Sequence, residues 1–319
     1  MRNMFAGAII FVAAIAASAQ PQGGTIKLVV PYPPGGTVDA LARAIAPCLN
    51  ESLKQPVIVE NRPGANEIIA ATQVAKARPD GRTLLVATDA GLTMNPHLYK
   101  KLPYDSQQDL EPVSQLVSVP VVLIATQNLA VSNARELVAL AKKRPSTLVY
   151  GSSGRGGITH VPMATFERNN DVSLVHAPYQ GASALMPDII GGQVQLALLS
   201  IALVEQHIND GSLKTLAVSG ERRMAAIPHV PTFAEQGLQD IGGTFFIGIS
   251  APAGTPIELR RKLSAAMRQV LTNPKFRGKY LDPFAYDVIA STPEAFREFL
   301  GVQQRLQAAR IKQSGASLD

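Results

Sequence analysis

The sequence predicts an α/β protein built from two similar units with a cleft between them. Short apolar runs alternate with amphipathic helical segments along most of the chain, a pattern typical of doubly wound, mostly parallel sheets flanked by helices. Back-to-back extended runs at 112–117 and 120–125, and a later one at 243–250, interrupt this alternation. We interpret them as two crossover strands. Domain 1 then comprises residues 20–121 and 245–319, and domain 2 comprises 122–244.

Residues 1–19 have the layout of a cleavable secretory signal, with Arg2, an apolar stretch and an Ala17-Ser18-Ala19 ending. The apolar stretch is short for a membrane span. Cleavage after Ala19 would leave 319 − 19 = 300 residues. Cys48 is the only cysteine and lies in a predicted helix, so the chain has none at the cleavage point for a lipid anchor. We expect an exported protein that is not lipid-anchored.

The first unit opens with an apolar strand that ends at Val30. The helix after it has its apolar residues on one face, at Val38, Leu41, Ala42, Ile45, Ala46, Leu49 and Leu53. The next predicted elements are a strand at 56–60, a helix at 67–77 and a strand at 83–88, which ends at Thr88 beside a possible ligand crevice.

The loop between the first strand and helix, 31–37, predicts an anion site. Its three prolines cannot continue the sheet, while Gly35 and Gly36 let a ligand approach the backbone. The N–H groups of Gly36, Thr37 and Val38 begin a helix, where a carboxylate or phosphate is favoured. A purely structural alternative stays open, in which the glycines only form the turn and Asp39 only caps the helix. No Walker or Gly-x-Gly-x-x-Gly pattern follows, which disfavours nucleotides.

The second unit repeats the alternation after Ser132. We expect helices at 133–143, from 158, at 182–190 and at 201–209, and strands at 148–150, 173–177, 194–199 and 213–218. Helices at 256–271 and 293–310 should pack back on the first unit.

A second glycine-rich loop follows the strand at 148–150 and predicts a matching anion site. It carries the hydroxyls of Ser152, Ser153 and Thr159, the guanidinium of Arg155 and the imidazole of His160. Tyr179 and Ser200 follow later strands of the same unit, so we place them at the same edge. Charge-assisted hydrogen bonds from several such groups would supply most of a useful affinity for a carboxylate.

Other classes of site have weaker support. Ser152 and Ser153 do not sit in Gly-x-Ser-x-Gly, and no acidic residue near His160 would orient it, so a serine esterase is a minor alternative. The five histidines have no metal-ligand spacing. The formal charge of +6 is scattered along the chain without aromatic interleaving, which argues against nucleic acid. We expect no cofactor, no metal and no catalytic residues.

Eight ordered motifs resemble the Bug receptors, the extracytoplasmic solute-binding proteins of tripartite tricarboxylate transporters. These motifs are VPYPPGGTVD at 30–39, VENRPGA at 59–65, PDG at 79–81, LYKKLPYD at 98–105, YGSSG at 150–154, PYQG at 178–181, PHVPT at 228–232 and APAGTP at 251–256. The resemblance covers nearly all of the chain after the signal. It implies a two-domain periplasmic binding protein of the Venus-flytrap type that closes on a small organic acid.

The resemblance also implies that one ligand carboxylate is held between the two glycine-rich loops, partly through ordered water. By position, this points to Tyr32, Gly36, Thr37 and Asp39 in domain 1 and to Ser152, Ser153, Thr159 and His160 in domain 2. The chain departs from the family pattern at several places. Tyr32 replaces a common phenylalanine, Asn66-Glu67 a usual glycine pair and Gln180 a frequent lysine, Arg155 takes a position that is often small or polar, and Phe245-Phe246 stand near a frequent tryptophan.

We therefore expect a monomeric periplasmic receptor that delivers a small carboxylate to membrane transporter subunits. Arg155 and Tyr179 in the distal wall favour a dicarboxylate, with aromatic ones such as terephthalate among the candidates. The same clamp could instead report its ligand to a membrane signalling partner, and the sequence does not separate these two roles.

Overall fold

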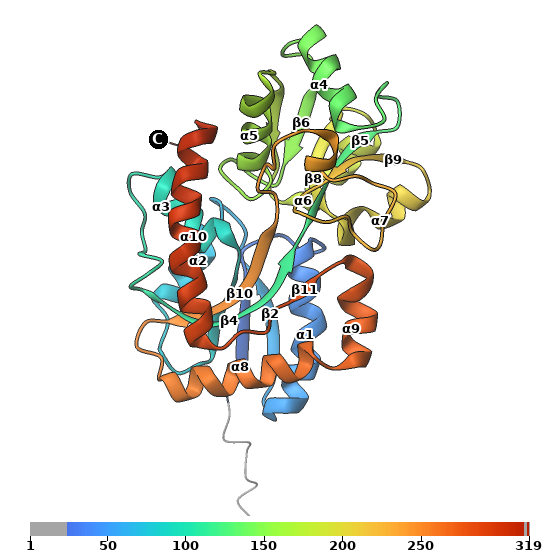
Figure 1. The fold of residues 1–319 in the computed structure, drawn as a ribbon. Coiled ribbons are helices and arrows are strands. Elements are labelled where there is room, and N and C mark those ends of the chain that lie inside the picture. Colours follow the sequence, from blue (N-terminus) through green and yellow to red (C-terminus); the bar gives the residue numbers. More distant parts are fainter. Residues whose placement is uncertain (1–23, 316–317, 319) are drawn as a thin grey trace, which may run out of the picture.

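The computed structural model describes residues 24–315 and 318, so the predicted signal at 1–19 lies outside the described residues. Two lobes lie one above the other in Figure 1. Lobe 1 is built on a sheet of order β11-β4-β10-β3-β1-β2, and lobe 2 on a sheet of order β7-β6-β8-β5-β9. The two-domain α/β class that the sequence predicts is confirmed.

The sheet of lobe 1 is covered on both faces. Its strands are β1 (Ile26–Val30), β2 (Val57–Asn61), β3 (Thr83–Ala87), β4 (Leu110–Val119), β10 (Phe245–Pro252) and β11 (Asp287–Val288). Side chains of a strand alternate between faces. Leu28 and Val30 accordingly share a core with helices α1 (Thr37–Leu53) and α8 (Ile257–Leu271), whereas Val29 packs with α2 (Ile68–Ala75) and α10 (Pro293–Ser314).

Lobe 2 has the same layered construction. Its strands are β5 (Val121–Thr126), β6 (Val149–Ser152), β7 (Val175–Pro178), β8 (Leu196–Ser200) and β9 (Leu213–Val218). Leu123 and Leu198 share a core with α4 (Ala134–Lys143) and α5 (His160–Asn170), while Val122 and Leu199 pack with α6 (Ala182–Ile190) and α7 (Ile201–Asn209).

Both sheets contain parallel and antiparallel strand pairs. The prediction that their strands would be mostly parallel is therefore wrong. Strands β2, β1 and β3 pair in parallel, as do β7, β6 and β8. The remaining pairs are antiparallel. In lobe 1 they are β10 with β3, β10 with β4 and β11 with β4; in lobe 2 they are β5 with β8 and β5 with β9. The reason is the crossing itself. The chain enters lobe 2 through β4 and β5 and returns through β10. The antiparallel pair β4 and β10 therefore lies in the sheet of lobe 1, and β5 lies in the sheet of lobe 2, antiparallel to β8.

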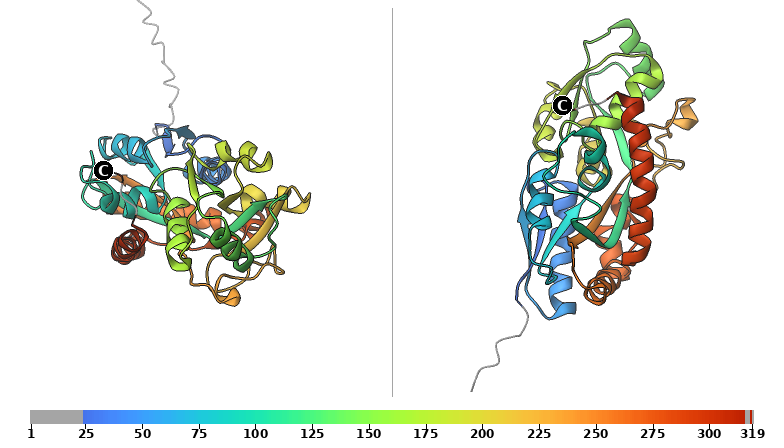
Figure 2. Two further views of the ribbon diagram at one scale, coloured as in Figure 1. Left: turned by 90° about the horizontal axis from the view of Figure 1, so that it is seen from above. Right: turned by 90° about the vertical axis from the view of Figure 1, so that its left-hand side faces the viewer.

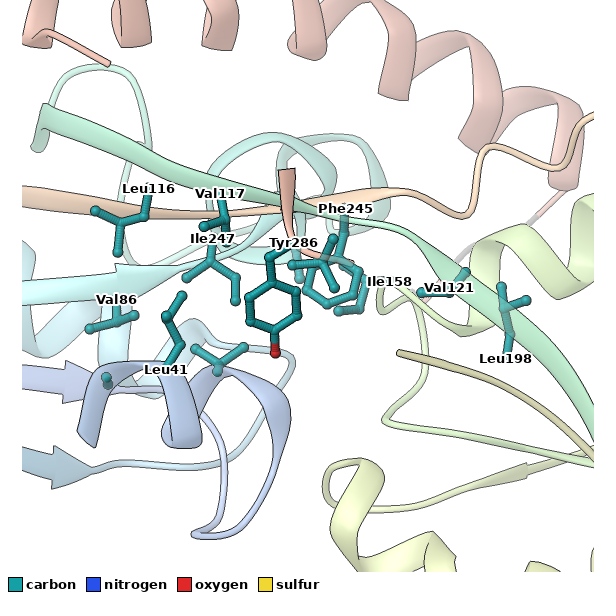
Figure 3. Packing of buried hydrophobic residues seen from close by; sticks show 14 of the residues in the cluster. Leu41, Val86, Leu116, Val117, Val121, Ile158, Leu198, Phe245, Ile247 and Tyr286 are labelled. Carbon is teal, nitrogen blue, oxygen red and sulfur yellow. The ribbon is translucent and has the colours of Figure 1, made fainter. Parts of the chain in front are cut away.

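The lobes share one apolar core at the crossing. Sheet membership changes at Pro120, between β4 and β5, and again ahead of Phe245, where β10 begins. Figure 3 shows Phe245, Ile158 and Val121 lying between the core of lobe 1 and Leu198 of lobe 2. This continuous packing joins the two lobes along the crossover strands.

Helix α10 extends the connection beyond the two strands. In Figure 2 its upper end reaches the helices of lobe 2. There Arg168 of α5 donates through Nη1 to the carbonyl oxygen of Gln313, over 2.7 Å. A C-terminal helix that the sequence assigns to domain 1 therefore also contacts domain 2.

Several short elements were not predicted from the sequence. They are the π-helix η1 (Ala90–Met94), α3 (Asn95–Leu98), α9 (Pro274–Tyr280), the 3-10 helices η2 (Ala234–Gln236) and η3 (Asp282–Phe284), and β11. None of the helices in the described part of the chain is both long and apolar enough to cross a lipid bilayer.

Candidate ligand-binding site

The cleft between the lobes contains two adjoining compartments. The inner compartment has a cavity volume of about 40 Å³ and the outer one about 270 Å³. Four residues line both compartments and so form the boundary between them: Tyr32, Pro33, Ser153 and Gly181. The inner compartment has the size of a small polar group, and the outer one can hold the body of a small organic molecule.

Hydroxyl groups from both lobes surround the inner compartment. Lobe 1 contributes Gly36 and Thr37, which open α1, and lobe 2 contributes Thr159 and Ser200 besides Ser153. The N-cap of α1 is Gly36, which has no side chain to bond the first N–H groups of the helix. Those N–H groups favour an anion at this end of the helix. The inner compartment therefore suits a carboxylate.

The two lobes touch directly at this point. The hydroxyl oxygens of Thr37 and Ser200 lie 2.6 Å apart, and Ser183 Oγ donates to the carbonyl oxygen of Pro34 over 3.4 Å. Thr37 begins α1 and Pro34 lies in the loop before it, whereas Ser200 ends β8 and Ser183 lies in the first turn of α6. The structure thus has its cleft closed over the inner compartment.

The outer compartment is lined by more varied groups. Arg155 and Tyr179 lie on the lobe 2 side, while Asn66, Glu67 and Tyr99 line the lobe 1 side. Within the described residues Arg155 is exposed and has no hydrogen-bond or ion-pair partner. The Tyr179 hydroxyl donates to Asp188, and this bond raises the pKa of Tyr179 to about 12. Arg155 is therefore the cationic side chain on the lobe 2 side that is available to an anion.

Of the twelve site residues predicted from the sequence, eight line these compartments. They are Tyr32, Gly36, Thr37, Ser153, Arg155, Thr159, Tyr179 and Ser200. The other four, Asp39, Thr88, Ser152 and His160, line neither compartment. Each instead forms hydrogen bonds close to the lining residues.

Asp39 is a structural acid. Its carboxylate accepts from the N–H of Gly35 at 2.9 Å, from Asn61 Nδ2 at 2.7 Å and from Arg43 Nε at 3.0 Å. Burial raises its pKa, but the hydrogen bonds from Arg43 and Asn61 outweigh this and the net shift is downward. Asp39 therefore ties down the loop ahead of α1 and does not cap the helix, whose N-cap residue is Gly36.

Ser152 points away from the cleft toward a stack of aromatic rings. Its hydroxyl lies 2.7 Å from His176 Nε2, so its histidine partner is His176 and not His160. His176 stacks on His160 with ring centroids 4.1 Å apart, and His160 Nδ1 accepts from the N–H of Gly156. Burial lowers the pKa of both histidines to about 4. The two neutral rings brace the Gly-rich loop, and the fully buried Ser152 is not presented to a substrate.

Glu67 is a functional candidate that the sequence reasoning did not include. Its carboxyl is buried beside the outer compartment and accepts the hydroxyls of Tyr32 at 2.6 Å and Thr88 at 2.5 Å, and the N–H groups of Thr88 and Gly91. Burial raises its pKa to about 7, against the lowering effect of the hydrogen bonds from Thr88 and Tyr32. Thr88 therefore does not line the cleft itself but holds Glu67, which does.

The backbone just before α2, which places the Glu67 side chain, is strained. Ala65, Asn66 and Glu67 have φ values of 46°, 50° and 73°, a left-handed conformation that costs non-glycine residues about 1 kcal/mol or more each. A polar pair at 66–67, just after Pro63-Gly64 and before an apolar helix, was the available signal. Ser183 was also missed, although it follows Gly181, which the sequence marks as a turn.

The family is shown by comparison with known proteins. A family model described as a tripartite tricarboxylate transporter family receptor matches residues 41–315. The chain belongs to this receptor family. The protein BugT of Bordetella pertussis is 32% identical over 294 residues, which cover 92% of this chain and 90% of BugT. The resemblance to Bug receptors is thereby confirmed.

Solved structures of receptors agree with the fold. The periplasmic binding protein BugD is 30% identical, with a TM-score of 0.88 over 93% of this chain and 99% of BugD. An R. palustris protein with adipate is 29% identical, with a TM-score of 0.89 over 94% of this chain and all of that one. MatC from Rhodopseudomonas palustris, with bound malate, is 27% identical with a TM-score of 0.85 over 90% of this chain and 99% of MatC.

Proposed function

We propose that the protein is a non-enzymatic periplasmic receptor that binds a small dicarboxylate between its lobes and delivers it to a tripartite tricarboxylate transporter. The observation that carries this proposal is the inner compartment. Hydroxyls of both lobes and the first turn of α1 converge there, and Thr37 bonds to Ser200 across the cleft. A carboxylate placed there would contact both lobes and favour the closed form.

Arg155 supplies the second half of the proposed specificity. It lines the outer compartment, which adjoins the inner one across Tyr32 and Ser153. A solute whose first carboxylate occupies the inner compartment can direct a second one toward this guanidinium. Solved relatives with adipate and malate support a dicarboxylate, and aromatic ones such as terephthalate belong in the test panel.

Replacing Arg155 by Ala tests this assignment. We expect the affinity for a dicarboxylate to fall about tenfold or more, because a charge-assisted hydrogen bond contributes roughly 1.5 to 3 kcal/mol. The affinity for the monocarboxylate of the same length should stay nearly constant. Isothermal titration of both acids measures the two effects. Arg144→Ala is the matched control, since Arg144 is an exposed arginine of lobe 2 outside both compartments. Equal losses for both acids would refute the role of Arg155.

A further inference from the structure

The hydrogen-bonding direction of Tyr32 is fixed by Glu67. Tyr32 lines both compartments, and its hydroxyl donates to Glu67 Oε1 over 2.6 Å. A phenol has a single proton. While Glu67 is ionised, Tyr32 therefore has no proton left for a ligand and can only accept hydrogen bonds through its oxygen.

The other partners of Glu67 hold this arrangement in place. Thr88 Oγ1 donates its only proton to the same oxygen, Oε1, and lies 3.3 Å from the Tyr32 hydroxyl. At that contact Thr88 can only accept, so the Tyr32 proton is directed toward Glu67 and Thr88 and not toward the cleft. The N–H groups of Thr88 and Gly91 donate to Oε2 over 3.2 and 3.1 Å. All four donors point at one carboxylate that is 1% exposed, which leaves it no room to rotate.

Gly91 shows how closely the site is built around the carboxylate. A Cβ atom at position 91 would lie 2.4 Å from Glu67 Oε2, so only glycine leaves the space that this oxygen occupies. On the other side, the left-handed backbone at 65–67 turns Glu67 inward. Two segments far apart in the sequence, Gly91 and residues 65–67, are thus shaped to hold the buried carboxylate of Glu67.

We infer that Glu67 is a positioning residue for ligand specificity: it makes Tyr32 an acceptor toward the cleft, so the solute is a dicarboxylate that also carries a hydrogen-bond donor, a hydroxyl or an amino group. This inference rests on the proposed function and refines its ligand class. A third carboxylate or a carbonyl at this point would meet the Tyr32 oxygen with no proton between them. A donor on the carbon chain satisfies that oxygen.

Tyr179, on the opposite lobe, also donates its hydroxyl proton to a carboxylate, as Tyr32 does. Its hydroxyl donates to Asp188, so this phenol also has no proton to offer. Two of the three tyrosines that line the outer compartment, Tyr32 and Tyr179, are therefore acceptors, while Arg155 supplies donors. This division separates the place of the second carboxylate from the place of the donor group.

The test compares dicarboxylates that differ only by a hydroxyl. The probes are succinate with malate, glutarate with 2-hydroxyglutarate, and adipate with 2-hydroxyadipate, titrated at pH 8.5, where Glu67 is ionised. In the wild type we expect the hydroxy acid of the best-fitting pair to bind about fivefold or more tightly than its parent. Tyr32→Phe should abolish that preference, because it should weaken the hydroxy acid about fivefold more than the parent acid.

Glu67→Gln should shift the preference toward the parent acid. The glutamine oxygen can accept the two N–H groups while its NH₂ donates to Tyr32 and Thr88, which frees the Tyr32 proton for the cleft. The parent dicarboxylate should then gain about threefold in affinity. Tyr104→Phe is the matched control, because this buried phenol donates to the carbonyl oxygen of Gly91 and lines neither compartment.

The outcomes separate this inference from the proposed function. If dicarboxylates bind but Tyr32→Phe weakens both members of a pair equally, the inference is wrong and the receptor function stands. Absence of a hydroxyl preference in the wild type also overturns it. If no dicarboxylate of any length binds, both fail together. The Tyr32→Phe result decides by itself if Glu67→Gln does not fold.

Discussion

Glu67 couples the stability of the protein to pH. Its pKa is about 7 in the folded chain against an ordinary value of 4.5. Between these two values the folded state keeps a proton that the unfolded chain has released. The free energy of unfolding therefore gains its full contribution from this group below pH 4.5 and loses it as the pH rises through 7.

Glu67→Gln should remove this dependence. From pH 5 to pH 8, the free energy of unfolding of the variant should rise relative to the wild type by on the order of 2 kcal/mol. Urea unfolding of both proteins at the two pH values measures the difference. Parallel pH profiles would show that Glu67 does not titrate in this range.

His160 and His176 act in the opposite direction. Their pKa values are lowered to about 4 from 6.5, so the unfolded chain binds protons in this window that the folded chain does not. Stability should therefore fall as the pH drops from 6.5 toward 4. His176→Gln, which keeps a polar partner for Ser152, should lose less stability over this range in urea unfolding. His229→Gln, at an exposed histidine, serves as the control and should follow the wild type.

For single residues, the direction in which a side chain points could not be predicted from the sequence. Ser152 and Ser153 are neighbours at one strand end, yet Ser153 lines the cleft and Ser152 contacts His176. Successive side chains of a strand point to opposite faces, and the motif alone does not say which of the two faces the ligand. Glu67 was missed because its position depends on three left-handed residues, which its sequence neighbours do not require.

At the level of elements, the Gly181 turn sets how closely lobe 2 can approach lobe 1. It precedes α6 with φ of 97°, and a Cβ atom there would lie 2.9 Å from Pro33 Cδ of the opposite loop. Gly181→Ala should therefore hinder closure and weaken ligand binding about tenfold, in addition to a loss of about 1 kcal/mol from backbone strain. Titration with the best ligand measures the affinity.

Gly211→Ala separates closure from strain. Gly211 has φ of 76°, but a Cβ atom there would have no neighbour within 4 Å. This variant should lose similar stability and keep the wild-type affinity. If both variants bind equally well, the contact between Gly181 and Pro33 does not limit closure.

Most helices and strands could be predicted because their apolar residues have regular spacing. The helix Thr37–Leu53 buries Val38, Leu41, Ala42, Ile45, Ala46 and Leu49, which are six of the seven residues expected on its buried face. The direction of the crossing strands could not be predicted, since an apolar run is the same for parallel and antiparallel pairing. The π-helix Ala90–Met94 was missed because it is short and entirely buried around polar groups such as Thr93.

At the level of the whole molecule, the crossover strands and α10 join two lobes whose facing loops line the proposed ligand site. Asp89 belongs to this junction, where it accepts from the N–H of Phe246 at the start of β10 and from Gln307 of α10. A polar contact therefore joins β10 and α10 where the chain returns to lobe 1. A ligand that contacts both lobes should stabilise the closed form and, with it, the folded state.

The most direct test of the receptor function is thermal unfolding of purified residues 20–319 with a panel of aliphatic and aromatic mono- and dicarboxylates. A ligand at a hundred times its dissociation constant should stabilise the protein by about 2.7 kcal/mol. We predict a clear rise in Tm with dicarboxylates of one length class and a smaller rise with the matching monocarboxylates. No rise with any carboxylate, for protein first freed of bound solute by unfolding and refolding, would contradict the proposed function.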